Sequence, residues 1–568
     1  MAQITSELVP LTPSIRHRFY EPVVFLYCII AANFKNNNTK TPDLETDYES
    51  KSPRDSFRCF VNKLGQICDS ERGGDTITAF AVLQPGSIEY RFASNNRDRR
   101  ALIQVKKYVT MILRILGEAS DDELKKEDLS QRDSVFSVVL RTVLAFNWPR
   151  ISLYVTALRQ HLVFCMDACQ NDASEEANSA LQDLFGLKHV VDRLSRDMKR
   201  GADEDDNRKF ADEALGLLQT IHKLYQSPFA EFLREKARQD RDLDNDSPWT
   251  ELRHAMGRLY SYYITVKVLV ATRMRREELF AQDIEVNFVP SSGPGDTPSM
   301  RRTSDGIAKR MTSNVAQREA ILRYVDSLHV GRDRFDKDLL DKTQPKCFQP
   351  IVHAEINLLD SILREGRESD ERPRFYREGD FGRYIGCSKP TCRLCGLYFQ
   401  SHPTAGVDVR PSHQNLYYKW RAPDVYKHDG LEADIERKGI LEKMLNAIRE
   451  ENFRVVQDQA PVRKRHDSHT SPSNPSELLG PKATWKSGLA ASFGRLDLSS
   501  VREVDDVEER GSAGGTTPRG SRESSVATVT PAAIAVTAGE RKTWSRTQRV
   551  HTVIDEDEDG GDDGGAKL

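Results

Sequence analysis

Three cysteines lie within nine residues of this chain, in the stretch CSKPTCRLC from Cys387 to Cys395. Cys392 and Cys395 have the C-x-x-C spacing that places two sulfurs about one helical turn apart, facing the same way. At a helix start the helix dipole favours their thiolate forms. His353, upstream, offers an imidazole. Together the three residues supply three zinc ligands and leave a fourth tetrahedral position open, which is typical of a catalytic zinc.

Glu355, two positions after His353, is the carboxylate that such a site needs. Bound zinc lowers the pKa of a water molecule to about 7, and a carboxylate beside the metal can take up and return the proton. Residues two apart on a regular helix point to opposite sides, because each step turns by about 100°. His353 and Glu355 therefore converge only if His353 stands at the helix entrance.

Short elements must position these residues. Apolar residues spaced three or four apart predict an amphipathic helix from His353 to Gly366: Val352, Ile356, Leu359 and Leu363. FGRYIGCS (381–388) predicts a short buried strand, and CRLCGLYF (392–399) predicts the start of a helix. The candidate ligands are thus expected at the entrances of two helices joined by a strand.

The rest of the chain is mainly helical in pattern. Residues 5–35 predict one helix, and apolar spacing from about 100 to 282 predicts four to seven packed helices. The exception is DTITAFAVLQPGSIEYRFASNN (75–96), where two β-rich runs flank Pro85-Gly86 and predict a β-hairpin. From 457 to 568 the chain is rich in Ser, Pro, Gly and charge, so a disordered tail is expected.

Composition argues against membrane, secreted and strongly basic classes of protein. The chain has 568 residues, 83 basic and 86 acidic, and a net charge of −3, so no overall attraction to nucleic acid or anionic membrane is expected, although local patches could provide one. The longest apolar run, 23–32, is about half a membrane span, and no secretory signal is seen. Nine cysteines do not suggest a disulfide framework. We expect an intracellular protein, cytoplasmic or nuclear, without a membrane part.

The order His-x-Glu on one helix and Pro-x-Cys-x-x-Cys at the next resembles the cytidine deaminase-like superfamily of zinc enzymes. The segments VHAEINLL, RYIGCSKPTCRLC and RPSHQNLYYKW are most similar to its fungal-expanded family, whose prototype is a rickettsial protein. The superfamily usually has Pro directly before the first cysteine, whereas Thr391 separates Pro390 from Cys392 here. We interpret this departure as a loop variation.

The resemblance implies an α/β fold, an α-β-α sandwich around a mixed sheet, combined here with a large all-α insertion or domain and the disordered tail. It implies that His353, Cys392 and Cys395 bind one Zn²⁺ and that Glu355 is catalytic. The implied enzyme is a cytidine or adenosine deaminase-like hydrolase of C–N bonds, acting on a nucleobase in a nucleotide or nucleic acid. Zinc-bound hydroxide would attack the amine-bearing carbon, with Glu355 as proton shuttle.

Deaminase folds place a hairpin directly before the His-x-Glu helix, and its second strand often ends in an asparagine that touches substrate. The best hairpin here ends at Asn95, far upstream, so we expect a split deaminase domain with Asn95, His413 and Tyr417 as substrate-binding residues. The expected organisation is an N-terminal helical region (1–74), the hairpin (75–98), a helical region or insertion (99–344), a zinc-binding core (345–430), a C-terminal helix (431–456) and the tail (457–568).

Alternatives remain open at this point. Cys392 and Cys395 could form a redox pair, and Cys387 could be a fourth ligand that closes a structural site, although a buried core position is favoured. His413 and Tyr417 fit turn or packing roles equally well. Arginines in 364–377 could steer an anionic substrate, but interleaved acids favour a solvated loop. The rival to an enzyme is a non-catalytic zinc-stabilised scaffold whose tail binds other proteins.

Overall fold

The computed structural model describes residues 7–32, 35–36, 52–84, 86–126, 129, 131, 133–197, 204–241, 248–368, 373–403, 406–458 and 463–464. All of them belong to one structural unit of the chain. Pro85 of the predicted turn and nearly all of the predicted tail lie outside the described residues.

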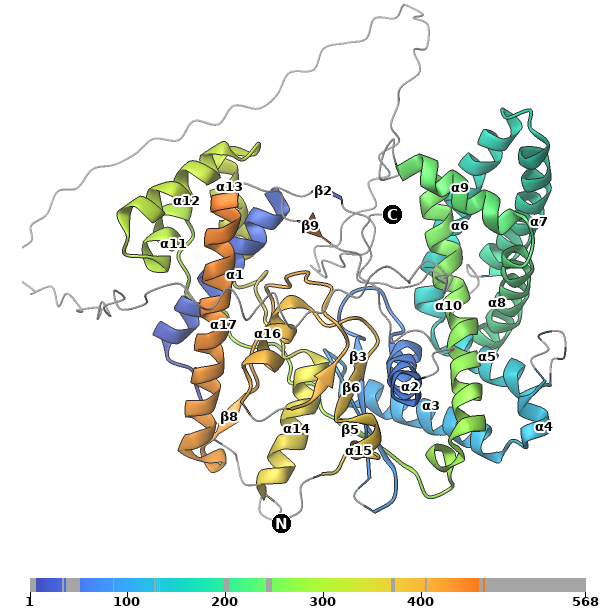
Figure 1. The fold of residues 1–568 in the computed structure, drawn as a ribbon, viewed down its shortest axis with the longest axis horizontal. Coiled ribbons are helices and arrows are strands. Elements are labelled where there is room, and N and C mark those ends of the chain that lie inside the picture. Colours follow the sequence, from blue (N-terminus) through green and yellow to red (C-terminus); the bar gives the residue numbers. More distant parts are fainter. Residues whose placement is uncertain are drawn as a thin grey trace, which may run out of the picture. The chain divides into compact units, whose positions relative to one another are not determined.

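A mixed five-stranded sheet of order β5-β4-β3-β6-β7 carries the site (Figure 1). Its strands are β3 (Thr78–Leu83), β4 (Glu89–Ser94), β5 (Glu285–Val289), β6 (Tyr384–Cys387) and β7 (Asp408–Val409). β3 pairs antiparallel with β4 and with β6, whereas β4–β5 and β6–β7 are parallel. The upstream hairpin and the strand of the cysteine segment therefore share one sheet.

Both faces of the hairpin are buried, but they differ in side-chain size. Large residues on one face, among them Phe80, Tyr90 and Phe92, pack in the core formed with α2 (Pro53–Cys68) and α3 (Arg99–Glu118). Small residues on the other face, Ala79, Ala81 and Ala93, lie in the core that contains α14 (Ala354–Glu368). A sheet covered on both faces explains why the strands read as continuous apolar runs instead of alternating ones.

Helix α2 lies very close to the sheet. A Cβ on Gly65 would lie 2.6 Å from the backbone nitrogen of Ser388 and 2.7 Å from the carbonyl oxygen of Thr78. Glycine at this position therefore permits an approach that a larger residue would prevent. Ser52 caps the helix by accepting a hydrogen bond from Asp55, and Pro53 follows at the first helical position.

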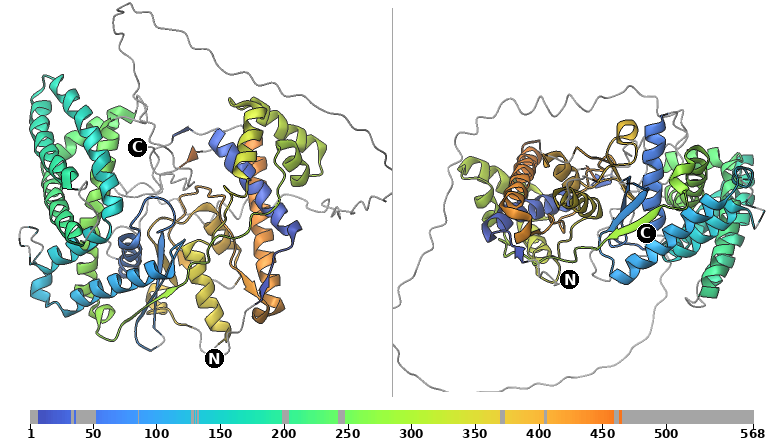
Figure 2. Two further views of the ribbon diagram at one scale, coloured as in Figure 1. Left: turned by 180° about the vertical axis from the view of Figure 1, so that it is seen from behind. Right: turned by 90° about the horizontal axis from the view of Figure 1, so that it is seen from below.

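Within the described residues of the predicted helical region, eight helices lie between Arg99 and Arg275, one of them only four residues long, compared with the four to seven expected: α3, α4 (Asp121–Leu124), α5 (Val135–Phe146), α6 (Trp148–Gln170), α7 (Glu175–Asp197), α8 (Glu204–Tyr225), α9 (Phe229–Arg241) and α10 (Pro248–Arg275). α5 to α10 pack on one another, and α10 also contacts α2. The region 99–344, expected to be helical, also contains the strand β5, which belongs to the sheet. Figure 2 shows β5 in green beside the blue hairpin.

Helices α1 (Pro13–Ala32) and α17 (Gly430–Asp458) pack together. One or the other of them contacts α11 (Ser304–Met311), α12 (Val315–Ser327), α13 (Gly331–Lys342) and α16 (Arg393–Ser401), whereas α15 (Glu378–Phe381) contacts α2. Short 3-10 turns lie at Glu277–Phe280 and Lys427–Asp429. Two small pairings join β1 (Leu8–Val9) to β8 (Val425–Tyr426) and β2 (Lys35–Asn36) to β9 (Arg463–Lys464). Among the described helices, none has both the length and the apolar content to cross a membrane.

Candidate metal centre

His353 stands at the entrance of α14. Its carbonyl oxygen accepts hydrogen bonds from the backbone N–H groups of Ile356 and Asn357, so it precedes the first residue of the helix. Because His353 is not itself helical, its side chain can point to the same side as Glu355, which two residues within a regular helix at this spacing could not do.

Cys392 holds the equivalent position at the start of α16. Its sulfur accepts a hydrogen bond from the backbone N–H of Cys395 at 3.4 Å, which makes it the N-cap of the helix. Nδ1 of His353 lies 3.5 Å from the Cys392 sulfur and 3.3 Å from the Cys395 sulfur. Two helix entrances and one strand thus bring the three predicted ligands together.

The three donor atoms fit a zinc ion. They all lie within 4.8 Å of one another. In a tetrahedral site with bonds of about 2.3 Å to sulfur and about 2.0 Å to nitrogen, neighbouring donor atoms are themselves about 3.5–3.8 Å apart. The observed nitrogen–sulfur separations are close to this range, and thiolate with imidazole is the donor set that zinc prefers.

The pKa values of the two thiols are shifted in opposite directions. Burial raises the pKa of Cys392, but its hydrogen bond with Cys395 and the charge of His353 outweigh burial, so the pKa lies well below its ordinary value. The pKa of Cys395 lies well above its ordinary value, because burial and the Cys392 charge both raise it. Burial lowers the pKa of His353, yet Cys392 raises it by more, and the net direction is upward. Without metal, Cys392 is thus the thiol of the pair that ionises more readily, and Cys395 the one that keeps its proton more strongly.

Glu355 is buried in the first turn of α14, with 4% of its surface exposed. Burial raises its pKa to about 7, with His353 acting in the opposite direction and Cys392 in the same direction. A carboxyl group with a pKa near neutrality can both accept and donate a proton at the working pH. Such a value suits a general acid–base group better than a permanently charged partner.

Asn95 ends the hairpin directly beside the entrance of α14. Its Oδ1 accepts a hydrogen bond from the Ala354 N–H at 2.7 Å, and its Nδ2 donates to the Gly74 carbonyl oxygen at 2.8 Å. The side chain is buried. The contact it makes here is therefore to the helix that follows His353, and its predicted contact with substrate stays a prediction.

His413 and Tyr417 also lie near the three ligands. The Tyr417 ring is edge-on to both neighbours, with ring centres 6.4 Å from His353 and 5.8 Å from His413. His413 is buried, its backbone N–H bonds to the Thr391 carbonyl oxygen, and its Nδ1 accepts from the Asn415 N–H. These contacts place both residues beside the centre, while their predicted binding of substrate stays a prediction.

Cys387, the third cysteine of the segment, lies away from this group. It is the last residue of β6, is fully surrounded by the apolar core, and burial raises the pKa of its thiol well above the ordinary value. It is not part of the three-residue donor cluster found among the described residues.

Trp420 is a neighbour of the centre that the sequence pattern did not single out. A bridge to Ile351, two residues before His353, holds it in place, and its fully buried ring contacts Tyr398 of α16. Its Nε1 makes no hydrogen bond to any described residue, although the indole N–H lowers the pKa of Cys395 against the larger effect of burial. A thiolate at Cys395, which a bound metal ion would maintain, would be a suitable acceptor for this buried N–H group.

Comparison with family models gives a match over residues 352–424, to the family described as OTT_1508-like deaminase (OTT_1508_deam). Residues 352–424 are therefore similar to a cytidine deaminase-like family named after a rickettsial protein. The matched segment includes the three donor residues and Glu355, but not the hairpin. Comparison with curated proteins and with solved structures found no match.

Proposed function

We propose that the chain is a zinc-dependent hydrolytic deaminase of a nucleobase, in a nucleotide or in nucleic acid. The observation that carries this proposal is the cluster of His353, Cys392 and Cys395 donor atoms within 4.8 Å of one another, with the buried carboxyl group of Glu355 beside it. A structural zinc site needs four ligands and no such carboxyl group, whereas a catalytic site needs three ligands and an open position. The deaminase family match over the same residues supports this choice.

The residues would divide the work as follows. His353, Cys392 and Cys395 hold a zinc ion, which supplies a Lewis acid that activates water at neutral pH. Glu355 would accept one proton from the attacking water and deliver it to the ring nitrogen next to the amine-bearing carbon. It would then take the second proton from the hydroxyl group added at that carbon and give it to the leaving amine, so that ammonia departs and the carbonyl group forms. Water and the aminated base thereby become ammonia and a base with a carbonyl group at that carbon.

We further propose that the hairpin and the segment 345–430 form one α-β-α deaminase domain, interrupted by the mainly helical residues between them. The pairing of Ala79 and Phe80 in β3 with Cys387 and Gly386 in β6 supports it. So does the hydrogen bond from Ala354 to Asn95.

The experiment is a paired measurement of metal content and of ammonia release, on free bases, nucleosides, nucleotides and oligonucleotides that contain cytosine or adenine. We expect one zinc per chain in the wild type and none in the His353→Ala, Cys392→Ala double variant. Glu355→Gln should keep zinc and lose activity. Glu365→Gln, on the same helix but exposed in the structure, is the matched control and should keep both.

Two results would contradict the proposal. A folded, reduced wild type without zinc would remove the metal centre. Zinc in the wild type, but no ammonia from any substrate, would instead favour the non-catalytic scaffold.

A further inference from the structure

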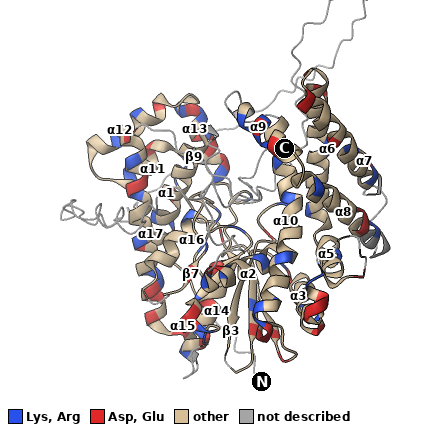
Figure 3. Cartoon of the chain, turned by 45° about the vertical axis from the view of Figure 1, so that its right-hand side comes forward, with Lys and Arg blue, Asp and Glu red and all other residues tan. Residues whose placement is uncertain are grey.

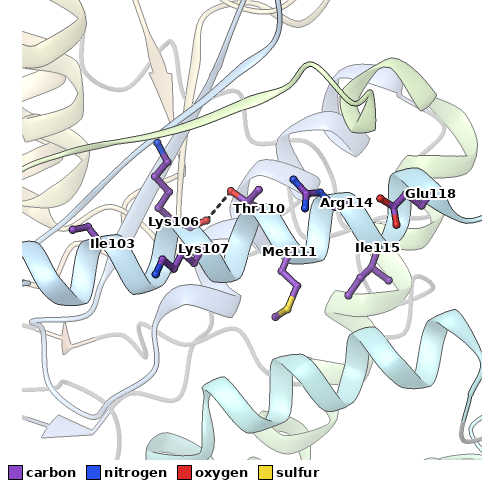
Figure 4. Close-up of a pocket in the computed structure, with 8 residues that line it drawn as sticks. All are labelled: Ile103, Lys106, Lys107, Thr110, Met111, Arg114, Ile115 and Glu118. Atoms are coloured by element: carbon purple, nitrogen blue, oxygen red, sulfur yellow. Dashed lines mark hydrogen bonds between the residues drawn. The ribbon is translucent and has the colours of Figure 1, made fainter.

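The outward face of α3 is basic. Arg99, Arg100, Lys107 and Arg114 are exposed and Lys106 is half-buried, whereas the opposite side of the helix packs in the core. The one acidic residue of the helix is Glu118, in its last turn. Figure 4 shows the part of this face from Ile103 to Glu118, which lines a hollow of ≈ 460 Å³.

These cations lack acidic partners within the part of the chain that the structure describes. None of the five is in an ion pair there, and Lys106 donates a hydrogen bond to the neutral side chain of Asn287 at 3.2 Å. Asp98, at the start of the helix, caps it by accepting from the Ala101 N–H. An unneutralised row of positive charge attracts polyanions.

Other basic segments behave differently. Figure 3 shows both basic (blue) and acidic (red) segments on several helices. On α11 and α12, Lys309 pairs with Asp305 and Arg323 with Glu319. Of the four arginines of 364–377 that the structure describes, three are paired, Arg364 with Asp360, Arg367 with Glu436 and Arg377 with Asp380, which leaves the single exposed Arg374. The α3 face, and not that loop, is therefore the strongest candidate for an anionic partner.

The basic face begins shortly after Asn95, the residue that contacts the entrance of α14. Arg99 follows Asn95 by four positions, and Asn95 bonds to Ala354 next to His353. Arg99 to Arg114 spans about 22 Å at the rise of about 1.5 Å per residue of an α-helix. Acidic residues gather at the far end of the helix, where Asp121 and Asp122 follow Glu118. The basic residues therefore occupy the helix from the end that follows Asn95, and the acidic residues lie at its other end.

We propose that this face binds the phosphate backbone of a single-stranded nucleic acid, one base of which enters the metal centre. The inference rests on the proposed function and names its substrate as a polymer. Aromatic side chains, on which single-stranded bases would stack, are missing from the outward residues of α3. The face therefore contacts phosphates without reading sequence, and base recognition belongs to the metal centre.

The test measures the binding of fluorescein-labelled 20-nucleotide RNA and DNA strands by anisotropy, as a function of salt. The variant replaces Arg100, Lys107 and Arg114 by Gln. The control replaces Lys309, Arg323 and Arg334 by Gln, so that it loses the same three positive charges elsewhere. Losing three phosphate contacts should reduce the slope of log affinity against log salt by about 2 and weaken binding by about tenfold or more.

Four outcomes would overturn the proposal: no binding by the wild type at low salt, equal binding by the variant, equal weakening in the control, or preferential binding of polyglutamate, which would indicate an acidic protein partner. Zinc content and ammonia release from free nucleosides are measured on the same preparations. If the variant keeps its zinc and its ammonia release but loses polymer binding, the result supports the proposed role of the α3 face and leaves the proposed deaminase function intact. If the wild type lacks zinc, the proposed function is wrong, regardless of how the labelled RNA and DNA bind.

Discussion

The carboxamide of Asn95 accepts a hydrogen bond from the backbone of Ala354 at 2.7 Å, although 259 positions separate the two residues. Ala354 is the first residue of α14 and follows His353 directly. A side chain at the end of the hairpin thus provides the acceptor for an N–H group that has no partner within its own helix. This contact links the hairpin to the position of the candidate metal ligand.

Asn95→Ala should lower the free energy of unfolding by about 1–3 kcal/mol, because the buried Ala354 N–H and the Gly74 carbonyl oxygen both lose a partner. Chemical denaturation of the zinc-loaded protein measures the change. Asn96→Ala is the control: Asn96 is exposed and makes one long bond to Asp75, so a change below about 0.5 kcal/mol is expected. Equal losses in the two variants would show that the Asn95 contact has no special role.

Trp420→Phe should weaken zinc binding by about 10- to 100-fold, because it removes the N–H group beside Cys395 while keeping an aromatic ring. Competition with a chromophoric chelator measures the affinity. Trp249→Phe, at a buried tryptophan of α10, is the matched control and should leave zinc affinity unchanged. Unaltered affinity in the Trp420 variant would mean that Trp420 serves packing alone.

Zinc affinity should rise with pH. Without metal, the pKa of Cys395 lies well above its ordinary value and that of His353 is raised, so binding must displace the thiol proton and, at lower pH, the imidazolium proton. Each displaced proton increases log K by about one per pH unit while the pH is below that group's pKa. Chelator competition from about pH 6 to about pH 8, corrected for chelator protonation, should therefore give a slope of about two that falls towards one. A flat profile would contradict this protonation scheme.

Cys387→Ala should keep one zinc per chain and lose about 1 kcal/mol of stability, because the thiol fills apolar space and lies apart from the donor cluster. Elemental analysis and denaturation measure the two effects. Cys392→Ala, in parallel, should lose the metal. Loss of zinc from the Cys387 variant would identify a fourth ligand and a closed, structural site.

Gly65→Ala should destabilise the protein by about 1–3 kcal/mol, because its new methyl group would meet backbone atoms of Ser388 and Thr78. Gly186→Ala, in α7 with open space around it, should be neutral or stabilising by up to about 1 kcal/mol. Thermal denaturation compares the two variants. Similar stabilities would mean that α2 can move away from the sheet without cost.

Local patterns in the sequence already contained much of the site. The apolar spacing after His353 predicted a helix that the structure has from Ala354 to Glu368, and the C-x-x-C pair lies at the start of α16 as predicted. The predicted strand over 381–388 is shorter, because Phe381 ends α15 and pairing begins at Tyr384. Patterns of this kind depend on neighbours a few residues apart, which is why one sequence suffices to read them.

Long-range contacts could not be read in this way. β5 is only five residues long, and its pairing with β4 depends on residues almost 200 positions away, so its short apolar run does not by itself predict a strand. The approach of Trp420 to Cys395 depends on its pairing with Ile351. By itself, the sequence determined the ligand types, their spacing and the helices that begin at them. Only the tertiary structure decided which sheet, which buried neighbours and which electrostatic environment surround the metal centre, because burial and long-range pairing arise when distant segments pack.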